Sequence, residues 1–249
     1  MAEKLLEVKN LRTEFKRDKT WVTAVNNVSF SIQPGEILGL VGESGCGKSV
    51  TSLSLMQLVQ RPAGQTVEGE IRFNSGDKVV NVVNAPASVM QKLRGNYMSM
   101  IFQEPMTSLN PTKKAGVQVD EIVRLHTDLE KEKRYEKVLE TFQAVGLKDA
   151  KKVYDSYPHQ LSGGMRQRVM IAMAVILHPD LIIADEPTTA LDVTIQTQIV
   201  ELLKDINKSE QNAMLFITHD LNLARRICHK VVVMKDGVVV EADETEKIF

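Results

Sequence analysis

The stretch GESGCGKS, residues 42–49, decides the fold predicted for this chain. It fits the pattern G-x-x-x-x-G-K-[ST], and it follows EILGLVG at 36–42, an apolar run that suits a buried strand. The next residues, KSVTSLSLMQLVQ at 48–60, are predicted to be helical. A strand, a glycine loop and a helix in this order predict a phosphate-binding loop. A tight turn alone would explain the glycines but not the lysine and serine in these positions.

Each residue type in this loop suits a bound phosphate. Glycines let backbone N–H groups close around the phosphates, Lys48 can reach the β- and γ-phosphates, and Ser49 offers its hydroxyl to Mg²⁺. A thiol at Cys46 needs no catalytic role, although its position predicts that alkylation keeps nucleotide out. The predicted nucleotide-binding residues here are Gly42, Glu43, Ser44, Gly45, Cys46, Gly47, Lys48, Ser49 and Val50.

Two carboxylates follow a second apolar run, LIIADE at 181–186. A buried strand that ends in an aspartate brings this carboxylate beside the phosphate-binding loop, at the carboxyl edge of the sheet. Asp185 is therefore predicted to hold Mg²⁺ together with Ser49. Glu186, one residue further, is predicted to polarise the attacking water. Without the loop, the same two acids would indicate no more than a solvated strand end.

Two further polar residues follow strand-like runs. His219 comes after AMLFIT at 213–218, and Gln103 comes after YMSMIF at 97–102. If these runs are neighbours in one parallel sheet, both side chains reach the same edge as Lys48 and Asp185. We predict that His219 contacts the γ-phosphate and takes part in catalysis with Glu186 and Lys48, and that Gln103 is a ligand of Mg²⁺ or of water. Neither residue alone indicates a function. Four strand ends that converge on one edge of a sheet do indicate a site.

Composition and charge narrow the class of protein. The chain has 249 residues, 43% of them hydrophobic and 25% charged, and a net charge of −1, which disfavours nucleic acid as the main partner. Two cysteines are too few for a disulfide framework, and no apolar run is long enough to span a bilayer. We expect a chain in a reducing, cytosolic compartment that reaches a membrane only through a partner.

The overall pattern predicts an α/β fold. Alternation and β-branched residues mark LLEVKNLRTEF at 5–15 and VTAVNNVSFSI at 22–32, and later apolar strands alternate with helices, so we expect a mainly parallel sheet. Between them, VQVDEIVRLHTDL at 117–129 and KEKRYEKVLETFQAVGL at 131–147 have helical spacing. This helical middle is predicted to be an inserted subdomain.

A second anion-binding device lies in LSGGMRQR at 161–168, before the apolar stretch MIAMAVIL. Free N–H groups at a helix start favour an anion. The inserted subdomain would hold this segment some distance from the phosphate-binding loop, so one chain cannot easily fold both onto one nucleotide. Two chains placed head to tail can. We therefore predict that Ser162, Gly163 and Gly164 bind the nucleotide held by the other chain.

The motifs together resemble the ATP-binding cassette (ABC) family, in the family's order and over residues 5–249. GESGCGKS is similar to its Walker A motif, Gln103 to the Q-loop, LSGGMRQR to the signature, LIIADE to Walker B, TALD at 189–192 to the D-loop and His219 to the switch histidine. This resemblance implies ATP hydrolysis at two composite sites of a dimer, with Glu186 as the general base. It also implies a role for Asp192 at the nucleotide, and adenine stacking by Phe15, with Trp21 as second choice.

The resemblance also implies an architecture. Residues 1–249 would form a single ABC ATPase domain with a RecA-like P-loop NTPase core. Residues 1–103 and 166–249 would hold the parallel-sheet core and an N-terminal antiparallel β-subdomain. Residues 104–165 would form the inserted helical subdomain that carries the signature.

The sequence around the motifs, such as FQEPMTSLNP and ADEPTTALDVTIQ, resembles that of the ATPase subunits of bacterial oligopeptide, dipeptide and nickel importers. This implies a second ATPase subunit, identical or paralogous, two membrane permeases that dock near residues 104–110, an extracytoplasmic solute-binding protein, and a peripheral position at the cytoplasmic face. Peptide is the expected solute, nickel complexes the near alternative, and a soluble non-transport ABC ATPase the rival. The subfamily usually continues past the point where this sequence ends, sometimes with iron–sulfur cysteines. A truncated chain, half of a tandem ATPase and a short natural member remain open.

Overall fold

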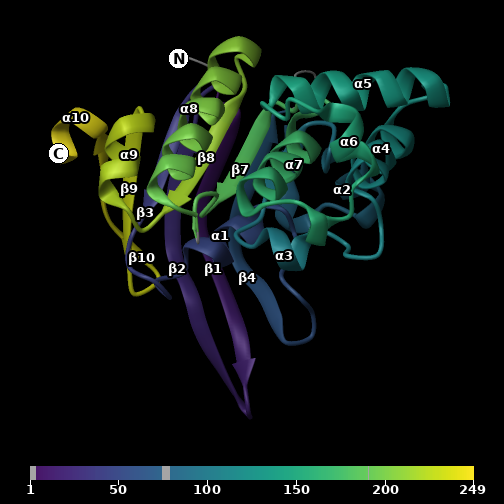
Figure 1. Ribbon diagram of the computed structural model, residues 1–249. Coiled ribbons are helices and arrows are strands. Elements are labelled where there is room, and N and C mark those ends of the chain that lie inside the picture. The colour runs from purple at the N-terminus through teal and green to yellow at the C-terminus, as the bar shows by residue number, and fades with distance from the viewer. Residues whose placement is uncertain (1–3, 75–78, 190) are drawn as a thin grey trace.

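The computed structural model describes residues 4–74, 79–189 and 191–249 (Figure 1). Residues 75–78, and Ala190 of the TALD segment, lie outside this part. The strands are β1 (Leu6–Arg17), β2 (Thr20–Ile32), β3 (Ile37–Val41), β4 (Gly64–Asn74), β5 (Val79–Asn81), β6 (Met98–Ile101), β7 (Leu181–Asp185), β8 (Ala213–Thr218), β9 (Lys230–Lys235) and β10 (Val238–Glu244).

Helices follow most of these strands along the chain. The α-helices are α1 (Lys48–Leu55), α2 (Ala87–Leu93), α3 (Pro105–Ser108), α4 (Ala115–His126), α5 (Lys131–Ala144), α6 (Ala150–Asp155), α7 (Gly163–Val175), α8 (Val193–Glu210), α9 (Leu221–Ile227) and α10 (Thr245–Ile248). Short 3₁₀ turns are η1 (Val82–Asn84) and η2 (Pro158–Gln160).

The larger sheet brings the predicted strand ends to one edge. Its order is β10-β9-β3-β8-β7-β6, with β9, β3, β8, β7 and β6 parallel and β10 antiparallel to β9. The mainly parallel sheet expected from the sequence is therefore confirmed. The register pairs Val41 with Thr218 and Asp185 with Ile217, so the loops after β3, β7 and β8 start side by side.

This sheet is buried on both faces, because alternate residues of its strands enter different hydrophobic cores. Leu38 and Leu40 of β3 pack with apolar residues of β1, β2, β4 and α1. Ile37 and Val41 join the other core, which also contains residues of α4, α5, α7, α8 and α9. Burial on both faces explains why the strands read as continuous apolar runs in the sequence.

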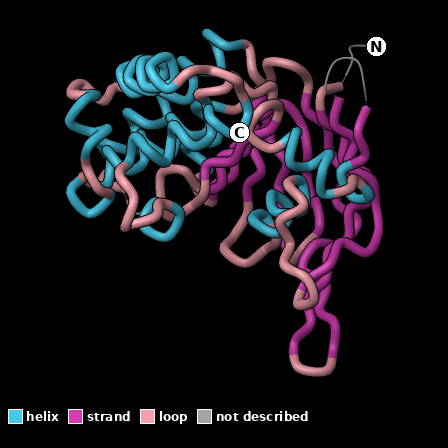
Figure 2. The backbone as a smooth tube through the Cα atoms, turned by 90° about the vertical axis from the view of Figure 1, so that its right-hand side faces the viewer, coloured by secondary structure: helices cyan, strands magenta, loops and turns pink. Residues whose placement is uncertain are grey.

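The smaller sheet has the order β2-β1-β4-β5 and is antiparallel throughout, as expected for the N-terminal region. It covers one face of the larger sheet, where Thr13 Oγ1 of β1 lies 2.9 Å from Ser54 Oγ of α1 in a buried contact. Figures 1 and 2 show that the β1–β2 hairpin extends well beyond the rest of the molecule.

The helices α4, α5 and α6 contact one another and gather on one side of the molecule, and α7 contacts α4, α5 and β6 (Figure 1). The first helix corrects the sequence prediction, because α1 ends at Leu55 instead of continuing to residue 60. Gln57 adopts a left-handed backbone with φ 51°. The Arg94 guanidinium then donates to the carbonyl oxygens of Met56 and Gln57 at 2.7 and 3.0 Å, which satisfies the end of the helix.

Candidate active site

The phosphate-binding loop joins β3 to α1 and encloses the Lys48 side chain. Lys48 is the first residue of α1 and is only 4% exposed. Its Nζ donates to the carbonyl oxygens of Gly42 and Glu43, both at 2.8 Å, and lies 3.9 Å from the Cys46 sulfur. Two carbonyl oxygens of the loop therefore hold the ammonium group beside the loop backbone. A phosphate bound there would find a positive charge next to the N–H groups of the loop.

One glycine of the loop is required by backbone shape and by space. Gly47 caps α1 with φ 102°, and a methyl group in its place would lie 2.5 Å from the carbonyl oxygen of Ala24 in β2. At the tip, Glu43, Ser44 and Gly45 are exposed. Below it, the Gly237 N–H donates to the Cys46 carbonyl at 3.1 Å, so the β9–β10 turn supports the loop.

Asp185 ends β7 directly beside the start of α1. Its Oδ1 accepts a hydrogen bond from Ser49 Oγ at 3.0 Å, and its Oδ2 accepts one from Ser52 Oγ at 3.1 Å. Burial raises the pKa of the Asp185 carboxyl above its usual value, and the two hydroxyl donors partly oppose this rise. A hydroxyl and a carboxylate so close together are hard oxygen ligands of the kind that Mg²⁺ prefers.

The Glu186 carboxylate contacts polar side chains from the ends of the two strands β6 and β8. Its Oε2 lies 3.2 Å from Gln103 Nε2 and 3.3 Å from His219 Nδ1, and it accepts a hydrogen bond from Thr189 Oγ1 at 2.8 Å. The backbone of Glu186 is left-handed, with φ 45°, a costly conformation that is found mostly at functional sites. The structure therefore brings Gln103, Glu186 and His219 together. The Gln103 amide nitrogen points at Glu186, and its role as a metal ligand stays a prediction.

Two polar residues of this site were missed from the sequence. Ser52 follows Ser49 by three residues on α1, and this helical spacing was the signal that could have found it. Thr189 is the first residue of the TALD segment, but no role of its own was predicted for it, because its contact with Glu186 depends on the tight turn in which the Thr189 N–H donates to the Glu186 carbonyl at 3.1 Å.

The signature segment lies apart from the loop. Ser162 is the N-cap of α7, and its Oγ accepts a hydrogen bond from the Met165 N–H at 3.3 Å. A methyl group on Gly164 would lie 3.0 Å from Ile195 Cγ2, so the start of α7 packs on the start of α8. Asp192 caps α8, accepting from the Ile195 N–H at 3.0 Å. Among the described residues, no hydrogen bond or ion pair links Ser162, Gly163, Gly164 or Asp192 to residues 42–50.

The two candidates for adenine stacking lie on the small sheet. Phe15 is paired with Gly64 of β4, and a methyl group on Gly64 would lie 2.6 Å from its ring. Trp21 lies on β2 opposite Lys16 and is 43% exposed. The assignment of either ring to adenine stays a prediction.

A buried strand, a glycine loop around a lysine, and a neighbouring strand that ends in an aspartate bonded to the loop serine define a P-loop NTPase. Comparison with known families refines this class. The profile described as "ABC transporter" matches residues 25–189, which include the loop, the signature and the two acids. The chain belongs to the ABC transporter family, and it is an ATP-binding ATPase of that family.

Relatives with high identity support this assignment. The chain is 48% identical over 245 residues to the oligopeptide transport ATP-binding protein AppD of Bacillus subtilis, covering 98% of this chain and 74% of AppD. It is 46% identical over 248 residues to the glutathione import ATP-binding protein GsiA of Pectobacterium atrosepticum, covering 99% of this chain but 40% of GsiA.

A solved structure confirms the predicted fold. The dimeric, post-hydrolysis structure of the ATP-binding cassette MJ0796 bound to ADP and Pi has a TM-score of 0.85 and 28% identity, covering 96% of this chain and 98% of that one. In the part of the chain that the structure describes, no helix is long and apolar enough to cross a membrane.

Proposed function

We propose that this chain hydrolyses Mg-ATP to drive the import of oligopeptides or dipeptides. The identity to AppD, named as an oligopeptide transport protein, supports the class of solute. The observation that carries the catalytic part is the Glu186 carboxylate, where Gln103, Thr189 and His219 converge on one oxygen at the sheet edge that holds the phosphate-binding loop. Among the described residues the second oxygen, Oε1, has no hydrogen-bond partner, and it would accept a proton from the attacking water.

Each residue of the site has its own proposed role at the nucleotide. Lys48 and the loop N–H groups bind the phosphates. Ser49 and Asp185 would hold Mg²⁺, which neutralises charge on the β- and γ-phosphates when bound. Glu186 is the general base, and His219 contacts the γ-phosphate. Because Lys48 already lies among carbonyl oxygens of its own loop, its ammonium needs only a short movement to reach a phosphate.

A second chain completes the site. Ser162, with the N–H groups of Gly163 and Gly164, would bind the nucleotide of a partner cassette placed head to tail, and Asp192 would face it at the start of α8. The separation of these residues from the P-loop within one chain supports this arrangement, and MJ0796 is dimeric. We propose that residues 104–165 form the helical subdomain that presents the signature, and that 1–103 and 166–249 form the core.

The partners follow from the same proposal. Residues 104–110 lie between β6, which leads to Gln103, and α4, and they would contact two membrane permeases, to which an extracytoplasmic solute-binding protein delivers the peptide. The chain would then lie at the cytoplasmic face of the membrane. Contact at this segment would reach the active site through Gln103 and its hydrogen bond to Glu186.

Reconstitution tests the proposal. The chain, assembled with its permeases in liposomes, is expected to hydrolyse ATP faster when peptide-loaded binding protein is added, and the Glu186→Gln variant is expected to lose this turnover. Stimulation by a nickel complex but not by peptide would contradict the proposed solute. Failure to assemble with permeases would contradict the transport role and favour a soluble ABC ATPase.

A further inference from the structure

Ser52 is a buried hydroxyl beside the proposed metal site, and the proposed function gives it no role. It lies within α1, is 0% exposed, and its Oγ is 3.1 Å from Asp185 Oδ2. The other oxygen of the same carboxylate, Oδ1, accepts a hydrogen bond from Ser49 Oγ at 3.0 Å. The two oxygens of Asp185 therefore have different partners. Oδ1 lies beside the predicted metal ligand Ser49, and Oδ2 lies against Ser52.

The single hydroxyl proton of Ser52 has two acceptors within reach. Besides Asp185 Oδ2, the carbonyl oxygen of Ser49 lies 2.8 Å from Ser52 Oγ. A carboxylate that ligates a metal ion is ionised, and hydrogen bonds to an ionised acceptor are roughly twice as strong as those between neutral groups. The proton is therefore expected on the side of Asp185 when a metal ion is bound. Among the described residues, no other hydrogen-bond donor reaches Oδ2.

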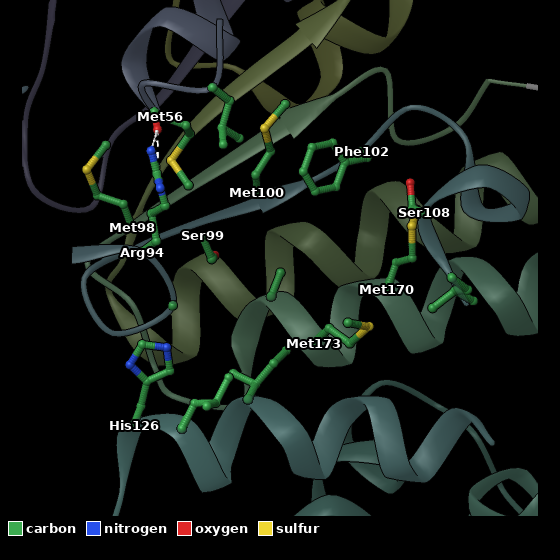
Figure 3. Close-up of a pocket in the computed structure, with 16 residues that line it drawn as sticks. Met56, Arg94, Met98, Ser99, Met100, Phe102, Ser108, His126, Met170 and Met173 are labelled. Atoms are coloured by element: carbon green, nitrogen blue, oxygen red, sulfur yellow. Dashed lines mark hydrogen bonds between the residues drawn. The ribbon is translucent and has the colours of Figure 1, made fainter. Parts of the chain in front are cut away.

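The helix that carries Ser52 is fixed at both ends. At its start, Ser49 Oγ donates to Asp185. At its end, the Arg94 guanidinium donates to the carbonyl oxygen of Met56, from Nε at 2.9 Å and from Nη2 at 2.7 Å (Figure 3). Asp185 is itself only 4% exposed, so neither partner of the contact between Ser52 and Asp185 can turn toward solvent. The contact is a fixed part of the site.

A carboxylate held in this way suits Mg²⁺ better than Ca²⁺. Mg²⁺ demands near-ideal octahedral geometry and is usually bound through one or two carboxylates. Ca²⁺ accepts about 6–8 oxygen ligands in a flexible geometry, and both oxygens of one carboxylate can be among them. While Ser52 occupies Oδ2, Asp185 offers one oxygen to an ion beside Ser49.

We propose that Ser52 is a positioning residue that determines the metal specificity of the ATP site. It holds Oδ2 of Asp185, so that the carboxylate reaches the ion through Oδ1 alone, and this favours Mg²⁺ over Ca²⁺. Ser52 acts through Asp185 and touches neither ion nor nucleotide. Because Ser49 and Ser52 are three residues apart on one helix, they lie on the same face of α1. This inference rests on the proposed Mg-ATP site and adds to it the residue that selects the ion.

Binding of a non-hydrolysable ATP analogue tests the proposal without depending on turnover. Isothermal titration calorimetry of the full chain in Mg²⁺, in Ca²⁺ and in EDTA gives the three dissociation constants. The wild type is expected to bind the Mg²⁺ form more tightly than the Ca²⁺ form. Ser52→Ala frees Oδ2, so the ratio of the dissociation constants, Ca²⁺ form over Mg²⁺ form, should fall about tenfold, as for the loss of a hydrogen bond to a charged group. In EDTA the two proteins should bind equally.

Ser54→Ala is the matched control. Ser54 lies on the same helix and is 3% exposed, but its Oγ donates to the Val50 carbonyl oxygen at 2.8 Å and contacts Thr13 Oγ1 instead of Asp185. Removal of this hydroxyl should leave the ratio as in the wild type. Ser52→Cys keeps a side chain of similar size with a weaker donor, and it should lower the ratio as alanine does.

Three results would overturn the proposal. The Ser52 variants could keep the wild-type ratio, Ser54→Ala could lower the ratio as much as Ser52→Ala does, or Ser52→Ala could weaken binding in EDTA as much as in Mg²⁺. A wild type with the same affinity for the analogue in Mg²⁺ and in EDTA would overturn the proposed metal site as well. The two failures are distinct, because only the second one is seen in the wild type.

Discussion

Thr189 Oγ1 donates a hydrogen bond of 2.8 Å to Glu186 Oε2, the shortest of the three polar contacts on this oxygen. The donor comes from the segment that runs into α8, and α8 packs on the signature helix through Ile195 and Gly164. Thr189 therefore orients the Glu186 carboxylate from three positions further along the chain. It lies in the segment that connects β7, at the proposed ATP site, with α8, which packs on the signature helix.

This contact predicts that Thr189 orients the general base. Thr189→Val keeps the shape but removes the donor, and we expect kcat to fall about tenfold, as for the loss of a hydrogen bond to a charged group, with little change in the KM for ATP. Thr189→Ser keeps the hydroxyl and should restore most of the activity. Steady-state ATPase assays of the three proteins decide this. Equal rates for Val and Ser would show that the hydroxyl does not orient Glu186.

Asp185 predicts a pH dependence of stability in the absence of Mg²⁺. Its pKa is raised in the folded state, so its contribution is fully present below the ordinary value of 3.8 and is lost as pH rises through the folded pKa. Asp185→Asn should remove this loss and raise the unfolding midpoint at neutral pH, while ATP hydrolysis disappears.

Thermal unfolding between pH 4 and 8, with and without Mg²⁺, measures this effect. Mg²⁺ should raise the midpoint of the wild type at neutral pH and leave Asp185→Asn unchanged. A midpoint of Asp185→Asn below that of the wild type at neutral pH would contradict the prediction, because it would mean that the ionised carboxylate stabilises the fold.

Ser162 predicts a separation of ATP binding from dimerisation. Ser162→Arg should leave ATP binding to the monomer intact, because Ser162 has no described contact with the P-loop, but it should prevent closure onto a partner. The substitution also removes a helix cap, at a cost of about 1 kcal/mol. Ser162→Asp is the control, since it keeps a cap acceptor yet repels the phosphates. ATP-induced dimers of either variant, seen by light scattering, would refute the role of the signature.

The sequence predicted the apolar strands well because burial on both faces leaves a long apolar run. LIIAD and AMLFIT coincide with β7 and β8. The length of α1 was not predictable. The helix ends where Arg94, which is distant in the sequence, donates hydrogen bonds to the carbonyl oxygens of Met56 and Gln57. Gln103, Asp185, Glu186 and His219 were predicted from strand ends, and the structure places them at one edge of the sheet. Thr189 was not predicted, since its orientation depends on the left-handed backbone of Glu186.

The central claim is that the signature of one chain completes the ATP site of another. Sedimentation of Glu186→Gln, with and without Mg-ATP, tests it most directly, because this variant should bind ATP but not hydrolyse it. We predict a monomer without nucleotide and a dimer with Mg-ATP. A chain that binds Mg-ATP and remains monomeric would contradict the claim that two copies of this sequence close head to tail around the nucleotide.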